Sequence, residues 1–324
     1  MTITDIVAEF GAYYINQGQN ASRLVQLLYR KSVTDSLFRS IVTDDTVYRA
    51  SQTRLGRILQ SFQKGWTPLG AMMATPIAIP QFKMKADVEE TPDDLEATWL
   101  GFLADGSLDR KVWPFVRWLM ETHLLPQIQE DYELYEVFNG VHAAPVNGVP
   151  GAAGTAMDGI KKIINTQVTA GRIVPISLGA IPDDPSAFVD YVEAFTDRIN
   201  VRYRGVPMNE TLSLRYARGK RAKYGKDFMS VSAPVIPDGD QPLLTGNKIE
   251  ETRHQVVGLP SMGNSLKIWC TPYDNTVRLA KKSQNVQQFQ IESVTRLVRL
   301  FTDFWKGLGF LIPEAVFTND QDLV

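Results

Sequence analysis

The chain has 324 residues, of which 44% are hydrophobic and 22% are charged, values typical of a soluble globular protein. The net charge of −2 excludes a global basic field of the kind that attracts nucleic acid or an anionic membrane. The single cysteine, Cys270, excludes a disulfide framework within the chain. The N-terminus lacks the basic and apolar regions of a secretory signal, and no apolar run is long enough for a transmembrane helix.

The first 50 residues predict short helices that share no core. One helix is expected over “NASRLVQLLYRK” (residues 20–31) and another over “VTDSLFRSIV” (residues 33–42), because each places its apolar residues on one helical face. Helices of this kind bury their apolar stripes only by lying on another part of the protein.

Residues 52–90 predict an extended two-stranded arm. Apolar and charged residues alternate strictly in “FKMKADVE” (residues 82–89), which indicates a strand with one apolar face. A weaker strand is expected over residues 57–63. The stretch between them, “KGWTPLGAMMATPIAIPQ”, is rich in glycine and proline and predicts an irregular extended tip, because proline cannot donate to a strand ladder.

Six apolar residues in this arm have no obvious core to join. They are Trp66, Leu69, Met72, Met73, Ile77 and Ile79. Two interpretations remain open, a flap that covers its own domain and an arm that lies on a neighbouring subunit. In the second interpretation the six residues form an inter-subunit contact.

Two helices follow the arm. Thr91 can cap a helix over residues 91–106, with Pro92 at its first position. A much longer helix is expected over residues 114–140, where aromatic and aliphatic residues trace a wide apolar stripe. Pro126 lies inside it and is expected to kink it.

Residues 141–155 are rich in glycine, proline and alanine and predict a domain boundary. Beyond it, helices and strands alternate. Helices are expected over residues 155–171, 185–199 and 214–225, and strands over residues 173–181, 205–212, 253–260 and 265–272. Over “SVTRLVRLFTDFWKGL” (residues 293–308) the spacing of apolar residues fits a helix, whereas the Val, Thr, Phe and Trp content favours a strand, which is our prediction.

The sequence predicts no catalytic residue, no cofactor-binding site and no metal site. His123, His142 and His254 lie in different expected elements without ligand spacing, and no common catalytic motif occurs. The glycines at positions 148, 151 and 154 precede a helix, but they do not match a nucleotide-binding motif, and a flexible joint is the favoured interpretation.

A basic cluster lies in the helix expected over residues 214–225. The exposed, solvated face of a helix would explain it. The alternative is contact with an acidic neighbour or with nucleic-acid phosphate, through Arg215, Arg218, Arg221 and Lys223.

The order of these parts resembles the major capsid protein of tailed bacteriophages, with its Hong-Kong-97-type fold, and most of all the capsid proteins of phages that infect Bacteroidetes. The residues that carry the resemblance span most of the chain. They are “KADVEETPDDLEATWLGFLADGSLDRKVWP”, “AMDGIKKII”, “VVGLPSMGNS”, “IWCTPYDN” and “GLGFLIPEAVFT”.

The resemblance implies an α+β fold of four parts. These are an N-terminal arm (residues 1–51), an extended hairpin loop (52–90), a peripheral domain built around a long spine helix (91–150 and 265–324), and an axial α/β domain (151–264). In the family the hairpin lies on the next subunit, and the C-terminal region forms long strands.

The resemblance also implies a structural protein rather than an enzyme. Such a protein assembles with itself into pentamers and hexamers of an icosahedral head that encloses double-stranded DNA, which it would contact non-specifically. It would assemble in the cytoplasm of a bacterial host and reside in the virion, without contact with a membrane. Portal, scaffold and auxiliary head proteins are candidate partners. The alternatives are an encapsulin-like protein shell and a soluble nucleotide-binding enzyme built on residues 151–264.

Overall fold

The computed structural model describes the greater part of the chain, with gaps. The described residues are 3–10, 12–13, 27–28, 32–91, 100, 115–199, 206–209, 212, 215–216, 218–219, 247–249, 255–282, 289–294 and 297–323. Helix and sheet are both present in them, as expected for an α+β protein. Within this part of the chain, no helix combines the length and the hydropathy needed to cross a bilayer.

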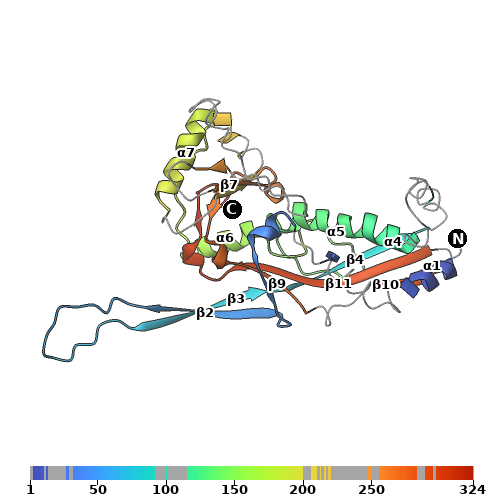
Figure 1. The fold of residues 1–324 in the computed structure, drawn as a ribbon, viewed down its shortest axis with the longest axis horizontal. Helices are drawn as coiled ribbons and strands as arrows, with labels where there is room; N and C mark the ends of the chain where they lie inside the picture. Colours follow the sequence, from blue (N-terminus) through green and yellow to red (C-terminus); the bar gives the residue numbers. More distant parts are fainter. Residues whose placement is uncertain are drawn as a thin grey trace.

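A five-stranded sheet runs along the long axis of the molecule, below the long helix in Figure 1. Its strands are β1 (Arg39–Val42), β4 (Phe82–Glu90), β9 (Thr276–Ala280), β10 (Gln290–Val294) and β11 (Leu297–Phe310). The long β11 is central, because it pairs antiparallel with β4, β9 and β10, while β1 pairs parallel with β9. At 3.4 Å per residue β11 extends roughly 47 Å. The strand predicted over residues 293–308 is confirmed from Leu297 onward, whereas residues 293 and 294 belong to the neighbouring β10.

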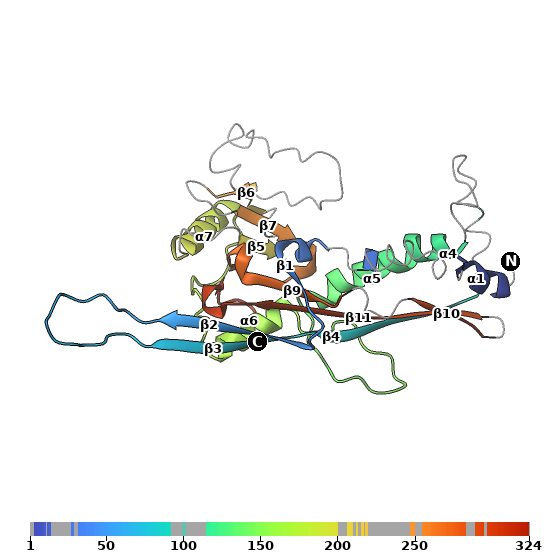
Figure 2. The same ribbon diagram turned by 60° about the horizontal axis from the view of Figure 1, so that its bottom comes forward.

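One helix runs along this sheet from Phe115 to Glu136 (Figures 1 and 2). Two α-helical stretches alternate with two π-helical ones. They are α4 (Phe115–Trp118), η3 (Leu119–Leu124), α5 (Leu125–Asp131) and η4 (Tyr132–Glu136). The long helix predicted from the sequence is confirmed over this range. The N-terminal helix α1 (Ile3–Phe10) packs against α4 and β10, and all of these elements contribute to the main hydrophobic core.

The hairpin of β2 (Val47–Leu55) and β3 (Met72–Pro80) projects from one end of the sheet (Figures 1 and 2). The two strands pair antiparallel, with Val47 opposite Pro80 and Leu55 opposite Met72. Residues 57–63, predicted as a weak strand, are not in a strand. The irregular tip predicted for residues 64–81 is also wrong from Met72 onward, where β3 is regular.

The hydrogen-bond pattern of the hairpin explains how β3 accommodates two prolines. The amide of Gln81 donates to the carbonyl of Thr46 (2.7 Å), and that of Gly56 to Ala71 (3.2 Å). Because bonded pairs alternate along an antiparallel ladder, the even-numbered residues of β2 face β3 and the odd-numbered ones face outward. Pro76 and Pro80 lie opposite odd-numbered residues, where an amide hydrogen would point away from β2.

A second body lies above the sheet and has its own hydrophobic cluster (Figure 1). Its helix is α7 (Pro185–Asp197), and its strands are β5 (Val206–Asn209), β6 (Asn247–Lys248), β7 (Gln255–Leu259), β8 (Trp269–Cys270) and β12 (Phe317–Thr318). The helix α6 (Ile160–Thr169) packs in the main core instead, through Ile160 and Ile164. The carboxylate of Asp184 accepts a hydrogen bond from the amide of Ala187 (2.9 Å) and caps α7. Short 3-10 turns are η2 (Thr34–Leu37), η6 (Pro260–Met262), η7 (Tyr273–Asn275) and η9 (Pro313–Ala315).

Three further secondary-structure predictions differ from the structure. Residues 173–181 make one isolated bridge, between Ile176 and Asn319, rather than a strand, and Pro175 removes a ladder donor beside it. Residues 33–42 form η2 and β1 instead of a helix, because β1 pairs with β9. The strand predicted over residues 265–272 is reduced to the two residues of β8.

Two predicted helices fall wholly or largely outside the described residues. Of the helix over residues 91–106, only 91 and 100 are described. Of residues 20–31, only 27 and 28 are described, and both are helical.

Candidate functional site

The tip of the β2–β3 hairpin carries a dense set of exposed apolar side chains. Phe62 and Trp66 are each 93% exposed, and neither has a core residue of this chain over it. The other exposed members of the set are Leu55, Ile58, Leu59, Leu69, Met72 and Met73. We call these eight residues the hairpin tip. A single exposed Leu needs no explanation, but a gathered set of this size is typical of an interaction surface.

Sequence reasoning found only half of this surface. Trp66, Leu69, Met72 and Met73 were singled out because they lie among prolines and glycines. Ile58, Leu59 and Phe62 were missed, because the pattern of “RILQSFQ” indicates a weak strand. Gly70, which has a φ of +90°, lies where a Cβ would come within 2.9 Å of Ile58, so the loop returns closely on itself.

The other two predicted contact residues belong to the base of the hairpin. Ile77 is 7% exposed and Ile79 is 3% exposed, and both pack against Val277 and Leu279 of β9. This burial inside the chain's own core removes Ile77 and Ile79 from the proposed inter-subunit contact. The flap interpretation therefore describes the base, whereas the tip remains uncovered by the described residues.

Two glycines of β11 let the hairpin base lie against the sheet. A Cβ at Gly307 would come 2.3 Å from the carbonyl oxygen of Pro80, and one at Gly309 would come 2.7 Å from the side chain of Ile79. The side chain of Gln81 adds polar anchoring, since its Nε2 donates to the carbonyls of Thr43 (3.0 Å) and Asp45 (2.8 Å). The hairpin is thus fixed at its base and free at its tip.

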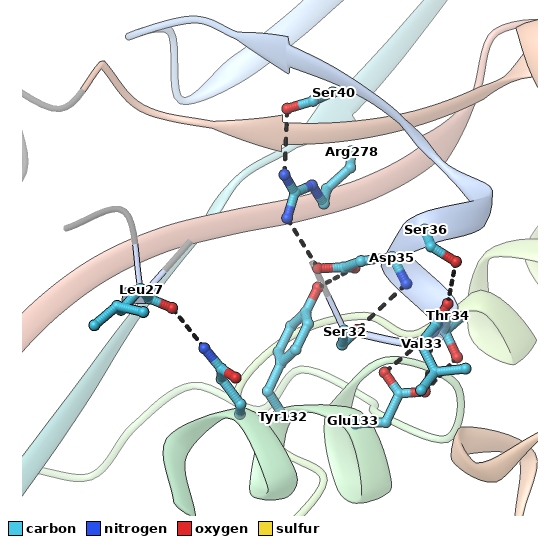
Figure 3. A network of polar contacts seen from close by, with 11 residues as sticks. Leu27, Ser32, Val33, Thr34, Asp35, Ser36, Ser40, Tyr132, Glu133 and Arg278 are labelled. Atoms are coloured by element: carbon cyan, nitrogen blue, oxygen red, sulfur yellow. Dashed lines mark hydrogen bonds and ion pairs between the residues drawn. The ribbon is translucent and has the colours of Figure 1, made fainter. Parts of the chain in front are cut away.

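A buried polar network joins the N-terminal segment, the long helix and the sheet (Figure 3). Asp35 is fully buried and accepts hydrogen bonds from Arg278 (3.1 Å) and from the hydroxyl of Tyr132 (3.0 Å). Beside it, Glu133 accepts from the hydroxyl (2.5 Å) and the amide (3.1 Å) of Thr34. Burial raises the pKa of Glu133 and holds that of Tyr132 well above its usual value.

Lys306 of β11 lies next to this network and is 2% exposed. Its Nζ lies 3.5 Å from the centre of the Tyr132 ring, a cation–π contact. Burial lowers the pKa of Lys306 to about 8, although the charge of Asp35 opposes this change. The contacts of these buried groups with one another explain them as a structural tie between the N-terminal segment, the long helix and the sheet.

The segment after the long helix is bonded in place rather than flexible. The carboxylate of Glu136 accepts the amides of Gly154 (2.9 Å), Ala156 (2.9 Å) and Met157 (3.2 Å). An anionic side chain therefore occupies the backbone donors that a phosphate cradle would require.

The first turn of α6 is satisfied in the same region. Three amides at the start of α6 donate to carbonyls of the turn that follows the long helix, in the pairs Gly159 to Gly140 (2.9 Å), Ile160 to Val137 (2.9 Å) and Lys161 to Phe138 (3.0 Å). This turn supplies the partners that the first amides of α6 lack within their own helix. This disagrees with the flexible joint expected from the sequence, and it leaves these three donors unavailable to a nucleotide.

The predicted basic residues are only partly described. Arg215 donates to the carbonyl of Pro182 (2.8 Å) and lies 3.4 Å from a carboxylate oxygen of Asp183, so its acidic neighbour belongs to this chain. Arg218 is exposed. Arg221 and Lys223 lie outside the described residues.

The predicted kink residue, Pro126, lies at the start of α5, directly after the π-helical stretch η3. The helix continues through it, and the amide of Leu125 donates to the carbonyl of Met120, five residues earlier. A wider π-helical turn moves the preceding carbonyls away from the proline ring. The effect of Pro126 on curvature stays a prediction.

The described histidines and the cysteine lie apart from one another in the fold. The ring of His123 packs against Trp118, and that of His142 against Phe82. Cys270 is buried, and burial raises its pKa to about 12. Over the described ranges, no three His, Cys, Asp or Glu side chains gather as metal ligands would. His254 is not among the described residues.

Comparison with known proteins reveals likeness in structure but none in sequence. No family model matches the chain, and the search of curated proteins gives no match. Among solved structures, the satellite phage P4 procapsid, which includes the size determination protein, matches at 11% identity with a TM-score of 0.51, over 93% of this chain and 98% of that one.

Two more structures match at similar strength. The capsid of an empty GTA particle has 12% identity and a TM-score of 0.51, over 89% of this chain and 88% of that one. The holo-encapsulin complex from Synechococcus elongatus has 9% identity and a TM-score of 0.50, over 89% and 86%. The likeness shows that this chain has the Hong-Kong-97-type fold expected from the sequence. It does not bear on the expected Bacteroidetes origin.

Proposed function

We propose that the chain is the major capsid protein of a tailed bacteriophage, which assembles with itself into the pentamers and hexamers of an icosahedral head. The head would enclose double-stranded DNA. The fold is compatible with this function, since the satellite phage P4 procapsid and the capsid of the GTA particle have a similar fold. Fold alone does not decide function, so the proposal also needs a feature of this chain that requires a partner.

The hairpin tip is that feature and carries the proposal. Its base is anchored to β9 and β11, whereas Phe62 and Trp66 lie almost wholly in solvent. A monomer would expose these side chains at a cost in solubility and would gain nothing from them. Contact with a second copy explains both the anchored base and the apolar end.

The proposed division of the fold follows the family. Residues 1–51 form the arm, 52–90 the extended loop, 91–150 and 265–324 the peripheral domain around the long helix, and 151–264 the axial domain. We assign assembly to the host cytoplasm and the mature location to the virion. Portal, scaffold and auxiliary head proteins remain candidate partners.

For the packaged DNA we propose non-specific contact through the basic helix. Arg218 is exposed, and Arg221 and Lys223 follow it in the sequence. Arg215 contributes less, because it is already bonded to Pro182 and Asp183. Such contact weakens steeply with salt.

The two alternative functions, an encapsulin-like shell and a nucleotide-binding enzyme, are not equally compatible with the structure. An encapsulin-like shell shares the fold and would use the same hairpin. The contents of the purified particles, nucleic acid or a protein cargo, discriminate the two. A nucleotide-binding enzyme built on residues 151–264 is disfavoured, because Glu136 and the turn that follows the long helix occupy the backbone donors that it would use.

Shortening the hairpin tests the proposal. Residues 57–70 are replaced by Asn-Gly, which suits a two-residue turn between the paired Gly56 and Ala71. This change keeps Ile77 and Ile79, whose removal would also damage the core. We expect a soluble protein that melts cooperatively but forms no shells, whereas the unaltered chain forms particles visible by electron microscopy.

The control replaces Phe62 alone with Tyr, which leaves most of the apolar surface in place and is expected to assemble. Normal particles from the shortened chain would contradict the proposed role of the hairpin. Small, discrete oligomers from the unaltered chain, measured by light scattering, would contradict the shell itself.

A further inference from the structure

Most of the exposed large hydrophobic side chains of the described residues belong to two segments of the chain. One is the hairpin tip. The other lies at the end of the long helix and in the loop after it, and comprises Leu134, Tyr135, Val141, Val146 and Val149. We call these five residues the loop patch. The remaining ones are single and dispersed along the chain, for example Val174 and Tyr273.

The loop that carries the patch has a defined conformation. The amide of Val141 donates to Gly154 (2.8 Å), that of Ala143 to Thr155 (3.1 Å), and that of Val149 to Val146 in a turn (3.2 Å). Glu136 holds the far end of the loop. Because these bonds fix the backbone before any partner arrives, docking here needs less ordering of the chain than docking on a mobile loop would.

The two surfaces match in chemistry. Residues 141–155 contain no Asp, Glu, Lys or Arg, in a chain that is 22% charged, and neither do residues 65–81 of the hairpin. Arg57 and Lys64 lie on the other side of the tip, where their long side chains can keep the charge in water. Valines of the loop patch and Trp66 of the tip therefore provide small and large apolar groups that can interdigitate without desolvating a charge.

The hairpin tip cannot reach the loop patch of its own chain. In Figure 2 the loop that follows the long helix (light green) projects below the sheet, whereas the hairpin tip lies at the far left of the view, at the free end of the hairpin. The base is fixed to β9 and β11, so the hairpin does not fold back.

We propose that the loop patch is the surface on which the hairpin tip of a second copy docks. The inference rests on the proposed function, which has the tip docking on another subunit, and it assigns the receiving residues. Tip and patch are different surfaces of one chain, so each copy donates one contact and accepts another. Such a head-to-tail contact closes into a ring when the rotation per subunit permits.

Charged substitutions test the receiving side. The double variant Val146→Glu with Val149→Glu introduces two carboxylates at positions that are 67% and 63% exposed, so folding is preserved. Buried against an apolar tip, these carboxylates would be unpaired, and we expect the yield of assembled particles to fall more than about tenfold. Val174→Glu is the matched control, since Val174 is 78% exposed but lies outside both surfaces, and it should assemble normally.

A parallel variant, Trp66→Glu, separates the two proposals. If Trp66→Glu blocks assembly while the double patch variant assembles like the control, the tip docks elsewhere and the inference is wrong. If Trp66→Glu also assembles normally, the hairpin contact of the proposed function fails as well.

Chemical cross-linking provides a direct measurement. Phe62→Cys and Val146→Cys are made in separate chains, mixed, assembled and treated with a short bis-maleimide. Cys270 stays unreactive because it is buried and its pKa is raised. We expect a cross-linked dimer in the mixture and not in either variant alone. Assembly of the mixture without that dimer would overturn the inference.

Discussion

Asp35 is the residue on which the buried network depends. It is fully buried, and it neutralises Arg278, whose side chain is 6% exposed. Asp35→Asn keeps the size of the side chain but removes the carboxylate charge that faces the buried guanidinium. We expect the free energy of unfolding to fall by about 3–5 kcal/mol. Urea denaturation at pH 7 measures this.

The matched control is the ion pair between Lys83 and Asp303 (2.7 Å), which lies on the outer face of the same sheet and is partly solvated. Asp303→Asn should cost less than about 1 kcal/mol, since water screens such pairs. If Asp35→Asn and Asp303→Asn lowered the free energy of unfolding equally, burial would not be the reason that the Asp35–Arg278 pair matters for stability.

Lys306 predicts a distinctive pH dependence. Its pKa is about 8 in the folded protein and 10.5 without burial, so between these values the unfolded chain binds more protons than the folded one. Stability from this group therefore rises with pH from about 8 upward. Tyr132 and Cys270, whose pKa values are raised, act in the opposite direction at higher pH.

Comparison with Lys306→Met isolates the lysine from these other groups. The variant should be more stable than the unaltered protein at pH 7, by up to about 3 kcal/mol, and the advantage should shrink as the pH rises from 8 to 9.5. Thermal melting at three pH values provides the measurement. An advantage that stays constant with pH would show that Lys306 does not change its protonation on folding.

At the level of elements, polar residues on buried faces limited what the sequence could predict. In β11 the even-numbered residues face the core, among them Val298, Leu300, Phe304 and Leu308. Thr302 and Lys306 occupy the same buried face and interrupt the alternation, so the pattern also fitted a helix. Lys306 is tolerated on this buried face because its Nζ contacts the Tyr132 ring and lies near the charge of Asp35. These contacts are tertiary, so the local sequence pattern does not reveal them.

β3 could not be predicted from the sequence for a different reason. Its prolines indicated an irregular tip, yet it is a regular strand because both prolines lie at positions whose amide would face away from β2. Predicting this requires the register of the pair, which depends on residues far away in the sequence. By contrast, “FKMKADVE” and the long helix were predicted correctly, since one element's periodicity was sufficient.

Pro126 allows a test of the long helix as an element. Pro126→Ala restores a backbone donor and removes the ring, so the melting temperature should be preserved or rise, by an amount equivalent to up to about 3 kcal/mol. If the π-helical stretch η3 exists to accommodate the ring, the helix should straighten. Particles should then become misshapen or change in size.

Electron microscopy of both proteins, assembled under identical conditions, measures the size distribution. Indistinguishable distributions would show that Pro126 is merely tolerated and does not set the curvature of the subunit.

At the scale of the whole molecule, the sequence predicted the order of the parts and the existence of an apolar arm. It did not predict which part of the arm is buried. Ile77 and Ile79 look like Met72 and Met73 in sequence, but Gly307 and Gly309 of β11, more than 200 residues later, create the surface that covers the isoleucines. The loop patch was also missed, because its small residues were interpreted as a linker.

The register of the hairpin also controls how far strand pairing can spread between copies. The outward-facing positions of β3 include Pro76 and Pro80, which have no amide hydrogen to donate, whereas the outward edge of β2 has no proline. A foreign strand can therefore add at β2 and not at β3. Two hairpins that meet edge to edge through β2 would present β3 on both outer sides, and growth would end there. The prolines of β3 thereby protect this hairpin from open-ended cross-β stacking.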